Sequence, residues 1–255
     1  MSLRVATYNI HKGFSQFNRR MVLHELRERL RETKADIVFL QEVQGQHALH
    51  ANRFTNWPAE PQYEFLADSM WAEHAYGRNA VYDHGHHGNA ILSRYPIISV
   101  ENQDISTNRF ESRGLLHCEI HVPRLDIKVH CLCVHFALIE EGRRRQLQAL
   151  IDRIRENVPA DAPVIVAGDF NDWRNRVGLR LHEAVGLQEV FRVHHGRSAR
   201  SYPSRLPLFC LDRIYVRGFR IAHAEVHHGQ VWSRISDHAM LSAQLAFMSE
   251  RRDQQ

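Results

Sequence analysis

The sequence predicts an α/β protein in which β-sheets pack together and are covered by helices. Short runs of β-branched and aromatic residues outnumber the segments with helical spacing. Several of these runs are apolar at every position, which is typical of strands covered on both faces. The runs do not alternate regularly with helices, so the pattern disfavours a simple βαβ succession.

Nine segments are predicted to be strands. The first, LRVATYNI at 3–10, is rich in β-branched and aromatic residues, and the second, DIVFL at 36–40, is a continuous apolar run. The remaining strands are expected at 89–93, 115–121, 129–136, 163–167, 212–216, 219–225 and 239–246.

Helices are predicted at 19–34 and 141–157, with a short one at 178–184. Apolar residues recur at helical spacing in the first two, as Leu23, Leu26 and Leu30 show. The chain of 255 residues contains no linker-like, low-complexity or repeated segment. We therefore expect one domain over 1–255, with a structured core at about 3–247 and a short polar C-terminal tail.

The charge balance indicates a mild preference for anionic partners. Lys plus Arg is 33 against 29 for Asp plus Glu, a net charge of +4. A solvated surface of mixed charge explains this equally well, and the arginines at 143–145 fall on the polar face of a predicted helix. Nucleic-acid binding does not follow from charge alone.

Cysteine use and hydropathy favour a reduced, cytoplasmic protein. Cys131 and Cys133 would share one face of a strand, which is a poor geometry for a disulfide, and their spacing is not that of a zinc site. We find neither a signal-peptide pattern nor an apolar run long enough for a transmembrane segment. Peripheral membrane contact stays open, and no protein partner can be inferred.

Polar side chains stand at the ends of six predicted strands. Ligand sites in layered α/β proteins gather at such ends, because the backbone there is rigid but no longer closed by ladder hydrogen bonds. Carboxylates and amides dominate the set, which favours a hard cation: Mg²⁺ or Mn²⁺, with Ca²⁺ as an alternative. Together with histidines they suit metal-assisted phosphoester hydrolysis. The residues are Asn9, Glu42, His135, Asp169, Asn171, Asp212, Asp237 and His238.

Taken singly, each of these residues has an ordinary structural explanation. An Asp or Asn after a strand is commonly a turn former or a helix cap, and a lone His is commonly a hydrogen-bonded core residue. In VIVAGDFND, alternate residues Asp169 and Asn171 would point the same way if the backbone stays extended. Asp172 would then point away, as a turn or capping residue.

The motifs TYNIH, LQEV, GNAILSRYPI, VHF, GDFN, LDRIYV and SDH, in this order, resemble the endonuclease/exonuclease/phosphatase superfamily. That superfamily includes DNase-I-like nucleases, abasic-site endonucleases, inositol-phosphate 5-phosphatases and neutral sphingomyelinases, and the chain is most similar to a compact bacterial branch. The resemblance covers residues 7–238. It implies a four-layer α/β sandwich, with two central mixed β-sheets flanked by helices and the site at one end.

The resemblance also implies catalytic roles. Asp169 would orient or deprotonate the attacking water, and Asn171 would donate to the phosphoryl oxygens. His238 would contact the scissile phosphate, held by Asp212, while His135 would support the phosphate or the leaving group.

For the metal, the resemblance implies Glu42 as the main ligand and Asp237 as a second ligand to metal or water. Asn9 would lie nearby and hold metal-bound water or phosphate. His11, Asn89 and Arg113 are weaker candidates for substrate contacts. Abasic-site endonucleases carry an acidic residue where this chain has His11, which argues against that subgroup.

Three functions remain open at this stage. The first is a phosphodiesterase or phosphatase acting on a small or lipid-derived phosphoester, the second a DNA or RNA nuclease, and the third a non-catalytic binding protein. The complete polar set disfavours the third. The segment PSRLPLF at 203–209 is either an apolar loop near the site or a loop packed on its own core. We favour a phosphodiesterase of undecided substrate.

Histidines and tryptophans add less specific expectations. The segment at 82–89 holds His84, His86 and His87, as a substrate-facing or metal-binding loop or as an exposed surface loop. Trp57, Trp71 and Trp232 could stack on a nucleic-acid base or pack in the core.

Overall fold

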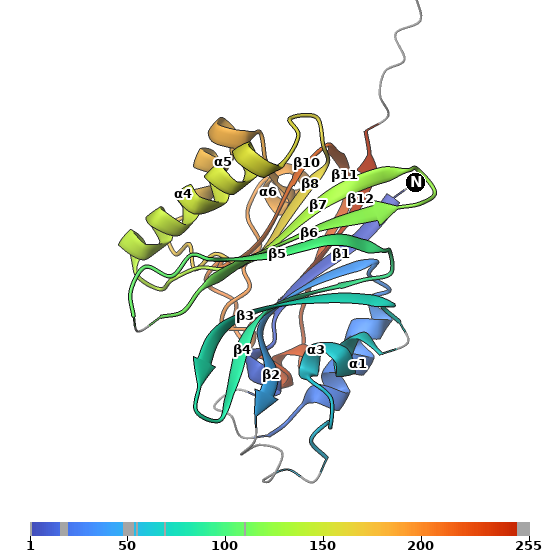
Figure 1. The fold of residues 1–255 in the computed structure, drawn as a ribbon, viewed down its shortest axis with the longest axis vertical. Helices are drawn as coiled ribbons and strands as arrows, with labels where there is room; N and C mark the ends of the chain where they lie inside the picture. Colours follow the sequence, from blue (N-terminus) through green and yellow to red (C-terminus); the bar gives the residue numbers. More distant parts are fainter. Residues whose placement is uncertain are drawn as a thin grey trace, which may run out of the picture.

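The computed structural model describes residues 2–15, 20–47, 54, 56–68, 70–109 and 111–248. Within them lie two six-stranded mixed sheets. The first has the order β11-β12-β1-β2-β4-β3 and the second β5-β6-β7-β8-β10-β9 (Figure 1). The parallel neighbours are β1 with β2 and β7 with β8.

The strand bounds of the first sheet are β1 Ser2–Asn9, β2 Ile37–His47, β3 Glu73–Tyr82, β4 Gly85–Ser93, β11 Phe219–His227 and β12 Met240–Phe247. Those of the second are β5 Ile97–Asp104, β6 Gly114–Val122, β7 Ile127–His135, β8 Val164–Asp169, β9 Gln188–Glu189 and β10 Asp212–Arg217. The helices are α1 Leu23–Glu32, α3 Gln62–Ala67, α4 Glu140–Asn157, α5 Val177–Val185 and α6 Val190–His195.

Helices cover the outer faces of both sheets, which gives the four predicted layers. Figure 1 shows α1 and α3 beside the first sheet and α4 and α5 beside the second. Apolar residues of α1 pack with Tyr8 and Leu40 of the first sheet. Those of α4 pack with Val134 and Val166 of the second. The expected four-layer α/β sandwich is confirmed.

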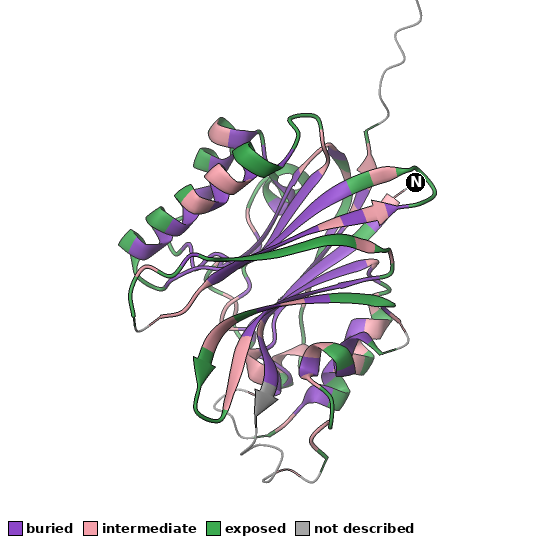
Figure 2. Ribbon diagram, viewed as in Figure 1, coloured by how far each residue is buried: buried purple, intermediate pink, exposed green. Residues whose placement is uncertain are grey.

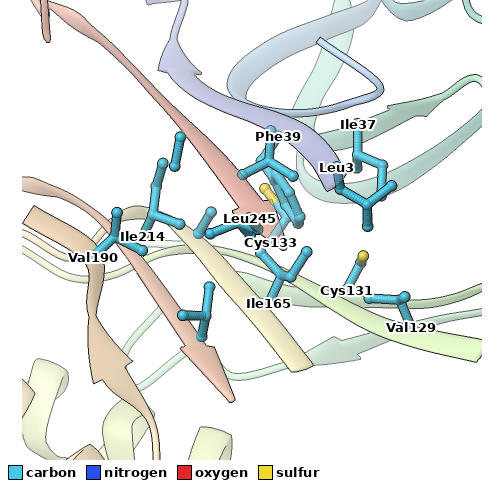
Figure 3. Close-up of a cluster of buried hydrophobic side chains, with 14 of the residues drawn as sticks. Leu3, Ile37, Phe39, Val129, Cys131, Cys133, Ile165, Val190, Ile214 and Leu245 are labelled. Atoms are coloured by element: carbon cyan, nitrogen blue, oxygen red, sulfur yellow. The ribbon is translucent and has the colours of Figure 1, made fainter. Parts of the chain in front are cut away.

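The strands are buried on both faces because the sheets also pack against each other. Figure 2 shows buried residues along the inner strands and exposed residues at edge strands such as β5. Leu3, Ile37 and Phe39 of the first sheet meet Cys133 and Ile165 of the second in one cluster (Figure 3). Alternate strand residues therefore face the other sheet or a helix, which explains the continuous apolar runs.

Several elements escaped prediction. Strands β3 and β5 carry many polar residues, and α3 and α6 are only six residues long each. The segment expected as a loop at 82–89 is instead a tight β3–β4 hairpin, with His84 in its turn. The cysteines are free, as expected. No helix among the described residues is apolar and long enough to cross a bilayer.

Candidate active site

A cavity of about 320 Å³ opens where strands from both sheets end. Its walls contain most of the residues predicted for the site. Those lining it are Asn9, His11, Glu42, Arg113, His135, Asp169, Asn171, Asp237 and His238. Asp212 lies behind His238, and Asn89 lies outside the cavity.

Sheet register brings three of these side chains next to one another. His135 pairs with Asp169 across the parallel strands β7 and β8, and Asp212 pairs with Asp169 across the antiparallel strands β8 and β10. Close approach of β8 to β7 depends on Gly168, because a Cβ there would lie 2.0 Å from the carbonyl oxygen of Val134. The GDFN glycine therefore permits the strand spacing on which this row of side chains depends.

Backbone conformation aims other side chains into the cavity. Glu42 has φ 55° at a bulge in β2, and a bulge redirects the side chains of a strand. His11, Lys12 and Asn171 also have positive φ. Non-glycine residues rarely adopt this conformation, and they cluster at functional sites. Four such residues around one cavity support a functional role for it.

Asp169 is a buried residue in the wall of the cavity with several polar neighbours. Its Oδ2 is 3.2 Å from Asn9 Nδ2, 3.6 Å from His135 Nε2 and 3.8 Å from His238 Nε2. Its Oδ1 accepts the backbone N–H of Asn171 at 2.9 Å. Burial raises the pKa of this carboxyl to about 6, although the neighbouring His238 opposes the shift. A carboxylate of this kind can accept a proton near neutral pH.

His238 is held by Asp212 in a buried pair. Its Nδ1 donates to Asp212 Oδ2 at 2.8 Å, and Asp212 is completely buried. Burial alone would lower the pKa of His238, but the Asp212 carboxylate overcomes this and raises it to about 10. The imidazole is therefore a buried cation at neutral pH, with its Nε2–H on the side of Asp169.

Glu42 is a half-buried carboxylate that stays ionised. Asn9 Nδ2 lies 3.4 Å from its Oε1. Burial would raise the pKa of Glu42, but nearby His135, Lys12 and His11 hold it at about 2. His135 has its own pKa lowered well below the ordinary value by burial and by Arg113, so it is neutral at neutral pH. At neutral pH, Lys12 and the His238 imidazolium are therefore charges that favour the ionised form of Glu42.

The chain is similar in sequence to a known protein family. The model of the Endonuclease/Exonuclease/phosphatase family matches residues 6–238. The chain belongs to this family.

Two bacterial relatives share more sequence identity with this chain than the solved structures described below. The uncharacterized protein YbhP of Escherichia coli (strain K12) is 50% identical over 244 residues, which cover 96% of each chain. A UPF0294 protein of Yersinia pseudotuberculosis is 38% identical over 123 residues, which are 47% of this chain and 42% of the relative.

Solved structures of the family share the fold. One from Beutenbergia cavernae has a TM-score of 0.75 at 20% identity and covers 96% of this chain and 72% of its own. D. rerio TDP2 complexed with single-strand DNA product has a TM-score of 0.68 at 18% identity and covers 96% and 99%. At such identities the likeness establishes the fold, here a DNase-I-like sandwich.

The donor set of this family member fits a divalent cation. Ligand atoms of Asp169, Asp212 and His238 lie within 4.8 Å of one another and could hold a metal. His238 and Asp212 already bind each other, however, and Asp212 is sealed from the cavity. Glu42 and Asp237 instead present carboxylates to the cavity itself. Hard oxygen donors of this kind suit Mg²⁺ or Mn²⁺.

Asn9 and Asp237 have partners within the site. Asn9 directs its amide nitrogen to the two carboxylates of Glu42 and Asp169, while its Oδ1 accepts the backbone N–H of His11 at 3.1 Å. Asp237 Oδ1 lies 3.4 Å from His11 Nδ1. Asn9 thus acts here as a donor between carboxylates.

The strand predicted at 163–167 extends two residues further, to Asp169, but the backbone is not extended beyond it. β8 stops at Asp169, and Asn171 has φ 47°, so the expectation of extended backbone through Asn171 was wrong. Asn171 still lines the cavity, with its amide donating to the Phe136 carbonyl at 2.9 Å. Asp172 is confirmed as a capping residue, because its two oxygens accept the N–H groups of Arg176 and Val177 at the start of α5.

Among the weaker candidates, Arg113 lines the cavity and is fixed by Glu111, 2.6 Å from its Nη2. Asn89 is buried and donates to the backbone carbonyls of Gly114 at 3.0 Å and Cys133 at 3.3 Å. Its amide connects the two sheets, so its position offers no route to a substrate contact.

Sequence reasoning missed Lys12, Trp173 and Tyr202, which also line the cavity. Lys12 and Trp173 directly follow the TYNIH and GDFND motifs, and that proximity was an available signal. Of the hairpin histidines, His87 lines the cavity, whereas His86 bonds the Tyr76 hydroxyl at 2.9 Å.

The tryptophans considered earlier do not line the cavity. Trp71 is buried and donates to the Ala35 carbonyl, and Trp232 packs edge-on against Tyr8. Trp57 stacks on Phe14. These positions favour the packing explanation for all three residues.

Proposed function

We propose that this family member is a divalent-metal-dependent phosphoester hydrolase, a phosphodiesterase or phosphatase that uses water as the nucleophile. The observation that carries the proposal is the surroundings of Asp169. A buried carboxylate with a pKa of about 6 lies between two imidazoles, and one of these is held as a cation by a second buried carboxylate. This arrangement supplies a proton acceptor beside a fixed positive charge.

The residues of the chain divide the chemistry between them. Asp169 orients a water and accepts its proton as the water oxygen bonds to phosphorus, while the ester P–O bond breaks and the leaving alkoxide takes a proton from solvent. His238 contacts the phosphoryl oxygens as negative charge builds on them, and Asp212 fixes its ring. Arg113 and Lys12 add positive charge at the cavity wall for an anionic substrate. A divalent cation bound through Glu42 and Asp237 would neutralise further charge on the phosphoryl group.

The proposal is tested with the chromogenic diester bis(4-nitrophenyl) phosphate. Hydrolysis should require Mg²⁺ or Mn²⁺ and stop in EDTA. Asp169→Asn should lower kcat by about 10²–10⁴-fold, the usual scale for loss of a general base. Asp172→Asn is the matched control, because it removes the same charge three residues away and leaves an oxygen for capping. Full activity in Asp169→Asn would contradict the role of Asp169.

A nuclease of the same chemistry is the second candidate. Trp173 and Tyr202 at the cavity offer aromatic faces on which unpaired bases could stack. A structure sharing this fold, TDP2 of D. rerio, is described with a single-strand DNA product. A panel of plasmid DNA, abasic DNA, RNA, inositol phosphates and phospholipids, each with an EDTA control, would separate the two candidates.

A further inference from the structure

Six large apolar side chains are exposed on three segments that each contribute one residue, Leu138, Trp173 or Tyr202, to the wall of the catalytic cavity. We define them as the apolar rim: Leu138, Ile139, Trp173, Leu206, Leu208 and Phe209. Their exposed fractions run from 39% to 67%, although residues of these types are usually buried. Leu138 and Trp173 also line the cavity, and the Phe209 ring lies 4.9 Å from that of Trp173. An exposed apolar group beside a polar site commonly marks an interaction surface.

The loop that carries half of the apolar rim is fixed at its base. Tyr202 and Phe209 pair as a two-residue bridge, which makes residues 203–208 the tip of a small hairpin. Ser204 donates its N–H to the Asp237 carbonyl and its hydroxyl to the Ser236 carbonyl, each at 2.7 Å. The tip is therefore attached to the segment that supplies His238, and its leucines stay outside the core.

Two further residues of the apolar rim, Leu138 and Ile139, lie on a turn that is fixed in a similar way. The buried Arg143 of α4 donates from Nη1 to the carbonyls of Ala137 and Leu138. This bond holds the turn before α4, where Leu138 and Ile139 are exposed. Hydrogen bonds thus hold both loops in place, and their apolar side chains are exposed to water in this fixed arrangement.

Arginines border the apolar rim on both sides. Arg174 follows Trp173 directly, and Arg176 lies beside it, with both guanidinium groups on the single carboxylate of Glu140 at 2.9 and 3.1 Å. Arg205 is exposed on the hairpin tip itself, where it shares a second cavity with Arg234. Glu140 and Glu141 directly follow Ile139, so the arginines border the apolar rim without enclosing it. Exposed apolar side chains bordered by cations are the pattern of proteins that insert shallowly into anionic lipid surfaces.

We propose that the apolar rim docks the protein on a bilayer that contains anionic phospholipids. Four of its six residues are aliphatic, and acyl chains accept aliphatic side chains, whereas nucleic-acid bases stack on aromatic ones. Docking through the rim places the cavity mouth against the lipid headgroups. Provided that the proposed phosphoesterase function holds, the substrate is then a phospholipid headgroup ester.

Vesicle co-sedimentation tests the docking. The full chain should bind phosphatidylcholine vesicles that contain phosphatidylglycerol, more weakly as salt rises. The double variant Leu206→Ser/Leu208→Ser should lower the partition coefficient about tenfold, since two partly exposed leucines lose burial in lipid. Ile98→Ser/Val100→Ser, which removes two exposed apolar residues from β5, should bind like the wild type.

Hydrolysis of bis(4-nitrophenyl) phosphate separates docking from catalysis. Leu206 and Leu208 do not line the catalytic cavity, so the double variant should keep the wild-type rate on this soluble diester. Failure of the wild type to bind anionic vesicles, or equal binding by the double variant, would overturn the docking. If the protein bound single-stranded DNA through the apolar rim and did not bind vesicles, membrane docking would be overturned and the rim would be a nucleic-acid binding surface. Rim-dependent vesicle binding without hydrolysis would support the docking and contradict the phosphoesterase function.

Discussion

The Nδ1 of His238 donates to the carboxylate of Asp212 at 2.8 Å, and no part of Asp212 reaches solvent. The two residues come from different sheets, His238 from the segment before β12 and Asp212 from the first position of β10. A charged pair buried in this way costs desolvation energy and is weak evidence for a stabilising role. Its position beside Asp169 instead indicates that it fixes the ring and charge of His238.

Asp212→Asn should therefore lower the pKa of His238 from about 10 toward the ordinary value of 6.5, because the charge that favours the imidazolium is gone. We expect kcat on the soluble diester to fall by roughly 10²–10⁴-fold. NMR titration of the imidazole measures the first effect. Asp126→Asn, which removes the exposed carboxylate beside His121, should change neither quantity. An unchanged His238 titration would refute the positioning role of Asp212.

Glu42→Gln should weaken metal dependence and leave the fold unchanged. The amide keeps the shape of the side chain but loses the charge that attracts a cation. The Mg²⁺ concentration for half-maximal activity should rise by at least about tenfold. Glu73→Gln, an exposed change on β3, is the control. An identical Mg²⁺ titration for wild type and Glu42→Gln would remove Glu42 from the metal site.

A buried histidine pair outside the cavity predicts acid sensitivity. Arg153 Nε donates to His117 Nδ1 at 3.0 Å, and His117 Nε2 lies 3.1 Å from His130 Nδ1. This chain of bonds requires neutral imidazoles. Burial, followed by Arg153, lowers the pKa of His117 to about 4, and burial also lowers that of His130.

The direction of this pH effect on stability follows from the number of protons bound by the folded and the unfolded chain. Between pH 6.5 and about 4 the unfolded chain binds a proton at His117 that the folded chain excludes. The stability from this site is complete above pH 6.5 and declines as pH falls through that window, by at most about 1.4 kcal/mol per pH unit. Urea unfolding of wild type and His117→Gln across this range measures the difference. Parallel pH profiles would contradict the prediction.

Asp172→Ala should destabilise the protein without a direct effect on chemistry. The change leaves the first N–H groups of α5 without their carboxylate acceptor. Loss of such a cap costs about 1 kcal/mol. The urea midpoint should fall accordingly, whereas Glu183→Ala, exposed on the same helix, should shift it much less. An unshifted midpoint in Asp172→Ala would mean that the cap contributes nothing.

Periodicity in the sequence was enough to predict packed sheets covered by helices, whereas the four-layer arrangement was implied by the family resemblance. Buried strands such as β2 and β8 are short apolar runs, and α1 and α4 show regular leucine spacing. Strands β3 and β5 were missed because their exposed positions carry polar residues that resemble loop sequence. Edge strands need fewer apolar residues, so their pattern is weaker.

The residues that make up the site could be predicted better than their arrangement in space. Motifs placed Asn9, Asp169 and Asp237 at strand ends, and the structure brings them to one cavity. Alternation along β2 would leave Glu42 on the helix-facing side with Leu40, and only the bulge with its positive φ changes this. Asn171 presents the same difficulty, because a single residue in the left-handed region is set by tertiary contacts.

The amide of Asn89 has a consequence for catalysis at a distance. Glu42 and Asn9 belong to the first sheet, whereas Asp169 and His135 belong to the second. The polar residues of the cavity therefore come from two separate sheets that face each other. Asn89 joins those sheets through the carbonyls of Gly114 and Cys133. The thickness of the apolar layer between the sheets therefore sets the spacing of the polar groups at its end. Substitutions that make this apolar layer thinner or thicker would therefore lower the turnover rate while the chain still folds.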